Sequence, residues 1–209
     1  MNPTTASTAP ARDIEFWFDF GSNYSYLSVM RIEAEAAARG VRIHWRPFLL
    51  GPIFRALGFD NSPFVLHKEK GAYVWKDMER QCRKYGIALT RPSVFPRAAL
   101  LAMRVALLGA EREWIAGYCR EIMQQNFVHD RDIGSVEVVS EALVKLGLPA
   151  QQIIAEAQSD ANKLRLREQT EAAAAKGIFG APTFFIGDEM FWGNDRLEDA
   201  LDFCYSSPC

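Results

Sequence analysis

The residues best suited to chemistry form a serine-containing turn, GSNYS at residues 21–25, between a strand-like segment and a helix-like segment. A helix N-terminus carries unpaired backbone N–H groups and a partial positive charge, so it stabilises an anion placed there. The turn is therefore the first candidate site. The alternative is that Ser22 or Asn23 is simply an N-cap, a common use of these residue types worth about 1 kcal/mol.

A second candidate lies at residues 177–185, which read GIFGAPTFF. Pro182 opens a predicted strand and removes one donor from the sheet. If its peptide bond is cis, the backbone groups of Ala181 turn outward, where an extended peptide can pair with them. The alternative is an ordinary loop-to-strand junction, because only about 5–6% of X–Pro bonds in folded proteins are cis.

Cysteine and histidine chemistry is not indicated. The four cysteines show no CxxC spacing, and the three histidines are scattered and are expected to be structural or on the surface. We therefore expect no metal site and a reduced, cytoplasmic protein. The cysteines are Cys82, Cys119, Cys204 and Cys209, and the histidines are His44, His67 and His129.

The elements around the first turn follow from the hydrophobic pattern. Residues 14–20 are typical of a buried strand, residues 24–39 of a helix that stops at Gly40, and residues 41–48 of a second strand. A strand-helix-strand unit has a right-handed parallel crossover and places the helix N-terminus at the carboxyl edge of the sheet, where ligands bind.

The rest of the chain is mostly helical in pattern. Strand signals return only near the end, around a Gly187-Asp188 turn, and a closing helix follows. We predict an α/β, thioredoxin-like fold with a large α-helical insertion. Its parts are a disordered tail at 1–12, a discontinuous thioredoxin-like domain at 13–50 and 171–209, and the insertion at 51–170. Expected elements are helices at 64–85, 96–109, 112–126, near 134 and at 149–176, strands at 182–186 and 190–192, and a helix at 196–204.

Composition limits the partners. The 209 residues are 49% hydrophobic and 12% aromatic, which suits one well-packed body. The net charge of −2 argues against nucleic acid and anionic membranes as partners. The first 13 residues lack the apolar core of a signal peptide, and no long uncharged apolar stretch indicates a membrane span.

Three motifs resemble one known family. Residues 18–27, FDFGSNYSYL, resemble the DF-x-SPYSYL opening of 2-hydroxychromene-2-carboxylate isomerases and kappa-class glutathione transferases, in the DsbA-like branch of the thioredoxin superfamily. Residues 177–185 resemble their GVFGVPTFF, and residues 191–197 are similar to their FWGNDRL, which is the most specific match. The resemblance spans nearly the whole chain after the tail.

The resemblance implies glutathione as cofactor and Ser22 as the catalytic residue. DsbA-like oxidoreductases carry Cys-x-x-Cys where this chain has SNYS, so disulfide exchange is excluded at this site. A serine hydroxyl can instead donate a hydrogen bond to the thiolate of a bound cofactor. A thiol with a pKa near 8.5 would then be largely ionised and nucleophilic at pH 7.

Further binding roles are implied by the same resemblance. Ala181, before Pro182, would pair its backbone with the glutathione cysteine. Asp195 would pair with the α-ammonium of the γ-glutamyl group, or cap the last helix, or both. The residues expected to hold the γ-glutamyl end are Trp192, Gly193, Asn194 and Asp195.

The implied reaction interconverts cyclic 2-hydroxychromene-2-carboxylate and an open-chain benzylidenepyruvate in aromatic degradation, by reversible addition of glutathione to a conjugated alkene. The pocket must then hold an aromatic ring and a carboxylate, for which Arg55, Asn61 and Phe95 are the candidates. Two positions depart from the family pattern. Asn23 replaces the usual proline, and Arg97 stands where relatives often have a small or amide residue.

Three alternatives remain open. A kappa-like glutathione transferase would consume glutathione, whereas an isomerase regenerates it. A non-catalytic thioredoxin-like binding module would have no glutathione affinity. A disulfide oxidoreductase would have to use cysteines outside the expected turn. The resemblance also implies a homodimer.

Overall fold

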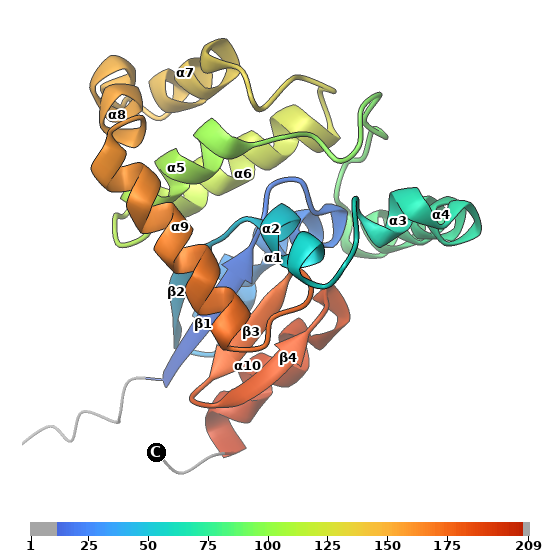
Figure 1. Ribbon diagram of the computed structural model, residues 1–209. Coiled ribbons are helices and arrows are strands. Elements are labelled where there is room, and N and C mark those ends of the chain that lie inside the picture. Colours follow the sequence, from blue (N-terminus) through green and yellow to red (C-terminus); the bar gives the residue numbers. More distant parts are fainter. Residues whose placement is uncertain (1–11, 207–209) are drawn as a thin grey trace, which may run out of the picture.

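The centre of the protein is a four-stranded mixed sheet in the order β2-β1-β3-β4 (Figure 1). The structure is a computed structural model that describes residues 12–206. β1 (Arg12–Phe18) pairs in parallel with β2 (Val41–Pro47), and β3 (Thr183–Ile186) is antiparallel to both β1 and β4 (Glu189–Trp192). The two ends of the chain thus build one sheet, as predicted. The predicted tail lies outside the described residues, except for Arg12, which begins β1.

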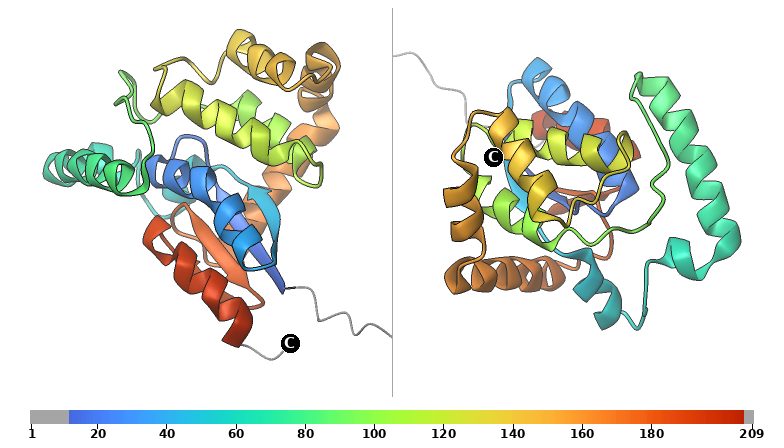
Figure 2. Two further views of the ribbon diagram at one scale, coloured as in Figure 1. Left: turned by 180° about the vertical axis from the view of Figure 1, so that it is seen from behind. Right: turned by 90° about the horizontal axis from the view of Figure 1, so that it is seen from above.

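The sheet separates two apolar layers because side chains alternate along a strand. Phe16 and Phe18 of β1 face a large core that includes α1 (Asn23–Ala38) and α10 (Leu197–Ser206). Trp17 faces a smaller cluster on the opposite side, built with residues of α2 (Leu50–Ala56) and α9 (Asp160–Ala175). The two views of the molecule agree, with α9 in front of the sheet in Figure 1 and α1 and α10 in front in the rear view of Figure 2.

Four helices pack above the sheet in Figure 1: α5 (Leu100–Gly109), α6 (Ile115–Phe127), α7 (Val136–Lys145) and α8 (Ala150–Ala157). Their apolar residues join the same core cluster as β1 and α1. The predicted insertion therefore shares its core with the sheet, and the boundaries at residues 50 and 171 stay a prediction.

Several helix boundaries differ from the sequence-based expectation. The predicted helix at 64–85 is two, α3 (Pro63–Leu66) and α4 (Lys68–Tyr85), separated by His67. The predicted helix at 149–176 is α8 and α9, because the Ser159 side chain accepts the Asn162 N–H and starts a new helix. α5 begins only at Leu100, and the short helix α2 is not signalled by the sequence pattern.

Helices α3 and α4 stand at one side of the molecule, as Figure 2 shows from above. They approach each other closely at Gly71, where an added Cβ would lie 2.2 Å from the Phe64 carbonyl oxygen. Trp75 of α4 packs edge-on against Phe95, with ring centroids 4.9 Å apart. Tyr26 of α1 donates a hydrogen bond to the Ala88 carbonyl oxygen just beyond α4. These contacts fix α4 as a wall opposite the start of α1.

Residues 12–206 contain neither a candidate membrane-spanning helix nor a candidate metal-binding cluster. No helix in that range is both long enough and apolar enough to cross a bilayer. No three of its histidine, cysteine or acidic side chains gather in a way that would hold a metal ion.

Candidate active site

A cleft of about 1220 Å³ opens at the carboxyl end of β1. Its walls come from the start of α1, from α2, from α3 and α4, and from the loops on either side of the β3–β4 hairpin. Pro182 is buried directly behind this surface, and its carbonyl oxygen accepts the Gly193 N–H at 3.0 Å. The other predicted site residues all line the cleft: Ser22, Arg55, Asn61, Phe95, Ala181, Trp192, Gly193, Asn194 and Asp195.

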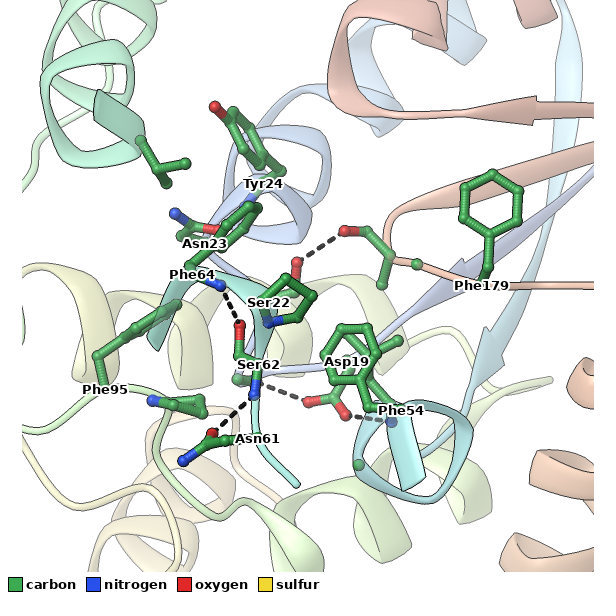
Figure 3. A pocket seen from close by; sticks show the side chains of 18 of the residues that line it. Asp19, Ser22, Asn23, Tyr24, Phe54, Asn61, Ser62, Phe64, Phe95 and Phe179 are labelled. Carbon is green, nitrogen blue, oxygen red and sulfur yellow. Dashed lines mark hydrogen bonds between the residues drawn. The ribbon is translucent and has the colours of Figure 1, made fainter. Parts of the chain in front are cut away.

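Ser22 links the two motifs that the sequence singles out. It is the N-cap of α1, and its Oγ accepts the Ser25 N–H at 3.1 Å. The same hydroxyl donates to the Ala181 carbonyl oxygen at 2.9 Å (Figure 3). The side chain is only 8% exposed. Ser22 is therefore both a helix cap and a cleft residue, so its N-cap role leaves the candidate-site interpretation of the turn open.

The position of Ser22 depends on Asp19, which follows β1. The Asp19 carboxylate accepts the Gly21 N–H at 2.7 Å and the Leu50 N–H at 2.8 Å, and the Asp19 carbonyl oxygen accepts the Ser22 N–H. Burial raises the pKa of the Asp19 carboxyl, although the two backbone N–H groups oppose that shift. Asp19 thus ties the β1–α1 turn to the start of α2. The family motif contains it, but nothing in the sequence pattern predicts this role.

The Ala181–Pro182 peptide bond is cis. Thr183 holds the segment by donating from Oγ1 to the Gly180 carbonyl oxygen at 2.9 Å. The Ala181 carbonyl group faces Ser22 across the cleft floor, as the dashed line in Figure 3 indicates. The second candidate segment therefore meets the first candidate directly.

An aromatic pair forms one rim of the cleft. Phe179 and Trp192 pack edge-to-face with centroids 4.8 Å apart, and both are more than 40% exposed. Gly180 lies beneath them, where an added Cβ would stand 2.3 Å from Trp192 Nε1. Only a residue without a side chain leaves room for the indole in this position.

If the cleft binds the glutathione that the sequence resemblance implies, Gly180→Ala should displace Trp192 and raise the dissociation constant for glutathione by about tenfold, the effect of losing roughly 1.4 kcal/mol of contact. The unfolding temperature is expected to fall by only a few degrees, because the half-exposed indole can move into solvent. Calorimetric titration measures the dissociation constant, and thermal unfolding measures the unfolding temperature. An unchanged dissociation constant would show that Trp192 does not contribute to glutathione binding.

The loop at residues 192–196 is anchored to α1 through Asn194. Its Oδ1 accepts hydrogen bonds from Ser28 Oγ at 3.2 Å and from Arg31 Nη1 at 3.1 Å, and the residue is 3% exposed. Arg31 also pairs with Glu198 and stacks on the Tyr85 ring. The side-chain oxygen of Asn194 is thus turned toward α1, so this residue positions the loop.

The Asp195 side chain is exposed at the cleft rim, where it pairs with Arg196 at 3.3 Å. It lies inside the 3₁₀ turn Asn194–Arg196 that leads into α10 and makes no capping bond there. The N-cap interpretation of Asp195 is therefore wrong, since the turn is preceded by Gly193 at φ 113° and Asp195 is already within it.

One face of α4 supplies a wall that the sequence motifs do not predict. Tyr24 of α1 donates from its hydroxyl to Asp77 Oδ2 at 2.7 Å across this wall. Burial and the neighbouring Asp77 carboxylate raise the pKa of Tyr24, so its phenol stays neutral. The signal available in the sequence is the helical spacing of the lining residues, which are Lys70, Tyr73, Val74, Asp77 and Gln81.

The remaining part of the cleft is largely apolar. Figure 3 shows Phe54, Phe64 and Phe95 around the space in front of Ser22. Asn61 Oδ1 accepts the Ser62 N–H at 2.7 Å, and Asn61 is itself exposed at the cleft. Apolar lining on this side includes Leu49, Leu50, Pro52, Phe54, Leu57, Phe59, Phe95, Leu100 and Met103.

Both departures from the family pattern line the cleft, but Asn23 is uncharged and the charge of Arg97 is paired. The Arg97 guanidinium is buried and pairs with Asp130, and it donates to Asn126 Oδ1 at 3.1 Å. Asn126 in turn donates to the Phe20 carbonyl oxygen at 3.1 Å. Arg97 therefore braces the wall of the cleft. Asn23 Oδ1 accepts the Tyr24 N–H at 3.0 Å, so this side chain also satisfies a donor of the first helical turn.

The described cysteines offer no alternative chemistry. Cys82 and Cys119 are free thiols, and both they and Cys204 are buried. Burial raises the pKa of the Cys82 thiol to about 11 and that of Cys119 well above its usual value. Such thiols are poor nucleophiles at neutral pH, which disfavours the disulfide oxidoreductase alternative. Cys209 lies outside the described residues.

Similarity to known proteins agrees with the geometry. Residues 13–203 match the DSBA-like thioredoxin domain. A 2-hydroxychromene-2-carboxylate isomerase of Pseudomonas putida is 33% identical over 186 residues, covering 88% of this chain and 90% of that protein. This chain belongs to the 2-hydroxychromene-2-carboxylate isomerase family of DsbA-like thioredoxin proteins.

Two further proteins are similar to this isomerase-family chain over most of its length. A solved structure of a 2-hydroxychromene-2-carboxylate isomerase superposes with a TM-score of 0.83 at 28% identity, covering 93% of this chain and 94% of that one. Glutathione S-transferase kappa 1 of Rattus norvegicus is 26% identical over 201 residues, covering 90% of this chain and 88% of that protein. The expected fold class is confirmed, and so is the expected family.

Proposed function

We propose that this member of the isomerase family is a glutathione-dependent isomerase of the 2-hydroxychromene-2-carboxylate type. The observation that carries the proposal is the position of the Ser22 hydroxyl. It lies at the N-terminus of a 16-residue helix, 2.9 Å from the Ala181 carbonyl oxygen, on the floor of a large cleft. That arrangement suits a peptide thiol whose sulfur is to be ionised.

The cleft has the polar groups that glutathione requires. Asp195 and Asp77 both lie close enough to Tyr24 to raise its pKa, so two carboxylates flank one region of the cleft and suit an α-ammonium group. Lys70 lines the same wall three residues before Tyr73 and suits the glycyl carboxylate. Ser22 caps α1 and Ala181 lies just before β3, and the cysteinyl part of glutathione would sit against this hydrogen-bonded pair.

Bound glutathione supplies a nucleophilic thiolate that adds reversibly to the conjugated alkene of the substrate and leaves again after rotation about the bond. Ser22 lowers the thiol pKa by donating to the ionised sulfur, and the positive end of the α1 dipole acts in the same direction. The chain itself contributes no exposed thiol among its described residues. The protein would therefore contribute the activation of the glutathione thiol and not a thiol of its own.

The other half of the cleft suits the substrate. An aromatic ring packs favourably against the phenylalanine side chains around Ser22, such as Phe54 and Phe95. Arg55 and Asn61 line the same half, and a guanidinium and an amide are natural partners for a carboxylate. Large apolar area with a few polar groups is the usual composition of a site for a small aromatic acid.

The test is a material balance with 2-hydroxychromene-2-carboxylate as substrate. We expect equilibration with the open-chain isomer only when glutathione is present, and we expect the amount of glutathione to stay constant. The similarity to a kappa-class transferase favours one competing outcome, in which glutathione is consumed as a stable conjugate. Consumption in step with turnover, or isomerisation without glutathione, would reject the proposal.

A further inference from the structure

The Ser22 hydroxyl has only one proton, and the structure assigns that proton to a specific partner. Ser22 Oγ accepts the Ser25 N–H at 3.1 Å and lies 2.9 Å from the Ala181 carbonyl oxygen. A carbonyl oxygen can only accept, so the hydroxyl must donate to Ala181. While it does so, it has no proton to give to a sulfur atom.

We propose that the Ala181 carbonyl group determines which thiols the site activates, by holding the Ser22 proton until an amide N–H of the bound thiol replaces it. This inference rests on the proposed function and deepens it. The site would activate thiols that carry an amide N–H beside the mercaptomethyl group, as a peptide-linked cysteine does. A thiol without that donor would bind but would be activated less.

The physical basis is the cost of an unpaired carbonyl group. Ala181 is partly buried, and a ligand that fills the cleft excludes water from it. If Ser22 turned toward the sulfur, the Ala181 carbonyl oxygen would lose the one side-chain donor that it has within residues 12–206. An amide N–H from the ligand removes that penalty, because a carbonyl oxygen has two lone pairs and can accept it before Ser22 leaves.

Binding of the amide and activation of the sulfur therefore favour each other. An unsatisfied buried acceptor costs about 1–3 kcal/mol, and one pKa unit corresponds to about 1.4 kcal/mol. The bound thiol pKa should thus differ by about one unit between a thiol with the amide N–H and a matched thiol without it. Ser22 mediates the whole of this difference, because it is the group that exchanges partners.

The experiment compares glutathione with its depsipeptide analogue, in which an ester oxygen replaces the N–H of the γ-glutamyl–cysteine linkage. The thiolate absorbance of each bound ligand is followed across pH with wild-type protein and with Ser22→Gly. In wild type we expect the bound glutathione pKa to lie about one unit below that of the bound analogue, after subtraction of the difference between the free thiols. In Ser22→Gly we expect that difference to vanish.

Equal depression of the two pKa values in wild type would overturn the inference and leave the proposed function intact. A difference that persists in Ser22→Gly would also overturn it, because Ser22 would not be the mediator. No depression for glutathione itself would reject the proposed function as well. If the analogue binds too weakly to saturate, the pH dependence of its dissociation constant, from competition with glutathione, measures the same shift by linkage.

Discussion

Ser22→Ala is expected to lower kcat/KM for the glutathione-dependent isomerisation by about 10²–10³-fold, the usual effect of removing one donor that stabilises a developing anion. The hydroxyl accepts the Ser25 N–H at the α1 N-terminus and donates to the Ala181 carbonyl oxygen. The loss should be largest below the pKa of the free thiol, near 8.5, and should shrink at higher pH, where the thiol ionises without help. A pH profile of kcat/KM measures this trend.

Ser22 is also an N-cap, so the variant is expected to lose about 1 kcal/mol of unfolding free energy. Ser22→Gly separates the two effects, because glycine at an N-cap costs only a few tenths of a kcal/mol. Both variants should lose activity to the same extent. Turnover within threefold of wild type in either variant, over the whole pH range, would mean that the hydroxyl does not activate the thiol.

Ser25→Ala is the matched control in the same helical turn. The Ser25 hydroxyl is fully buried and has no hydrogen-bond partner among the described residues, whereas its backbone N–H serves Ser22. Removing an unpartnered buried hydroxyl is neutral or mildly stabilising. We therefore expect wild-type kcat/KM, which would show that the effect at Ser22 is not a general response of this turn.

Arg31→Ala is expected to raise the dissociation constant for glutathione by about tenfold and to lower the unfolding free energy by about 2–3 kcal/mol. Arg31 is 7% exposed, bonds to Asn194 and Glu198, and stacks on Tyr85. Without it, the loop at residues 192–196 loses its main link to α1. Because Ser22 is untouched, the pKa of bound glutathione should stay as in wild type. Calorimetry and thiolate absorbance measure the two quantities separately.

Arg39→Ala provides the matched control, because Arg39 also joins α1 to α10, through Asp202. That ion pair is exposed, and exposed pairs contribute about 0–1 kcal/mol. We expect little change in the dissociation constant for glutathione. If both variants weakened glutathione binding equally, the cause would be a general loosening of the α1–α10 contact. A changed thiol pKa in Arg31→Ala would contradict the positioning role.

The sequence motifs predict the floor of the cleft well because both motifs are local. Ser22 follows a buried strand and starts a helix, and Pro182 opens the strand that pairs with that same first strand. Sheet pairing alone brings these two segments together. The N-terminal and C-terminal parts of the sheet could therefore be predicted from hydrophobic alternation and the Gly187-Asp188 turn.

The walls of the cleft could not be predicted in the same way. Asp77 reaches Tyr24 only because α4 folds back beside α1, and no local pattern encodes that contact. Arg97 departs from the family pattern, and its partner Asp130 lies 33 residues away, so the sequence does not show that its charge is paired. The side-chain oxygen of Asn194 accepts a hydrogen bond from Arg31, which is itself paired with the half-exposed Glu198. The motif resemblance instead assigns Asn194 to the ligand.

The most direct test of the account is the pKa of the glutathione thiol in its complex with the wild-type protein, from the ultraviolet absorbance of the thiolate. We predict a bound pKa below the free value near 8.5. Glutathione affinity should then increase with pH between the bound and free pKa values, because binding releases a proton in that window. Saturable binding with an unshifted pKa and a pH-independent dissociation constant would contradict the central claim that Ser22 and the α1 N-terminus ionise a borrowed thiol.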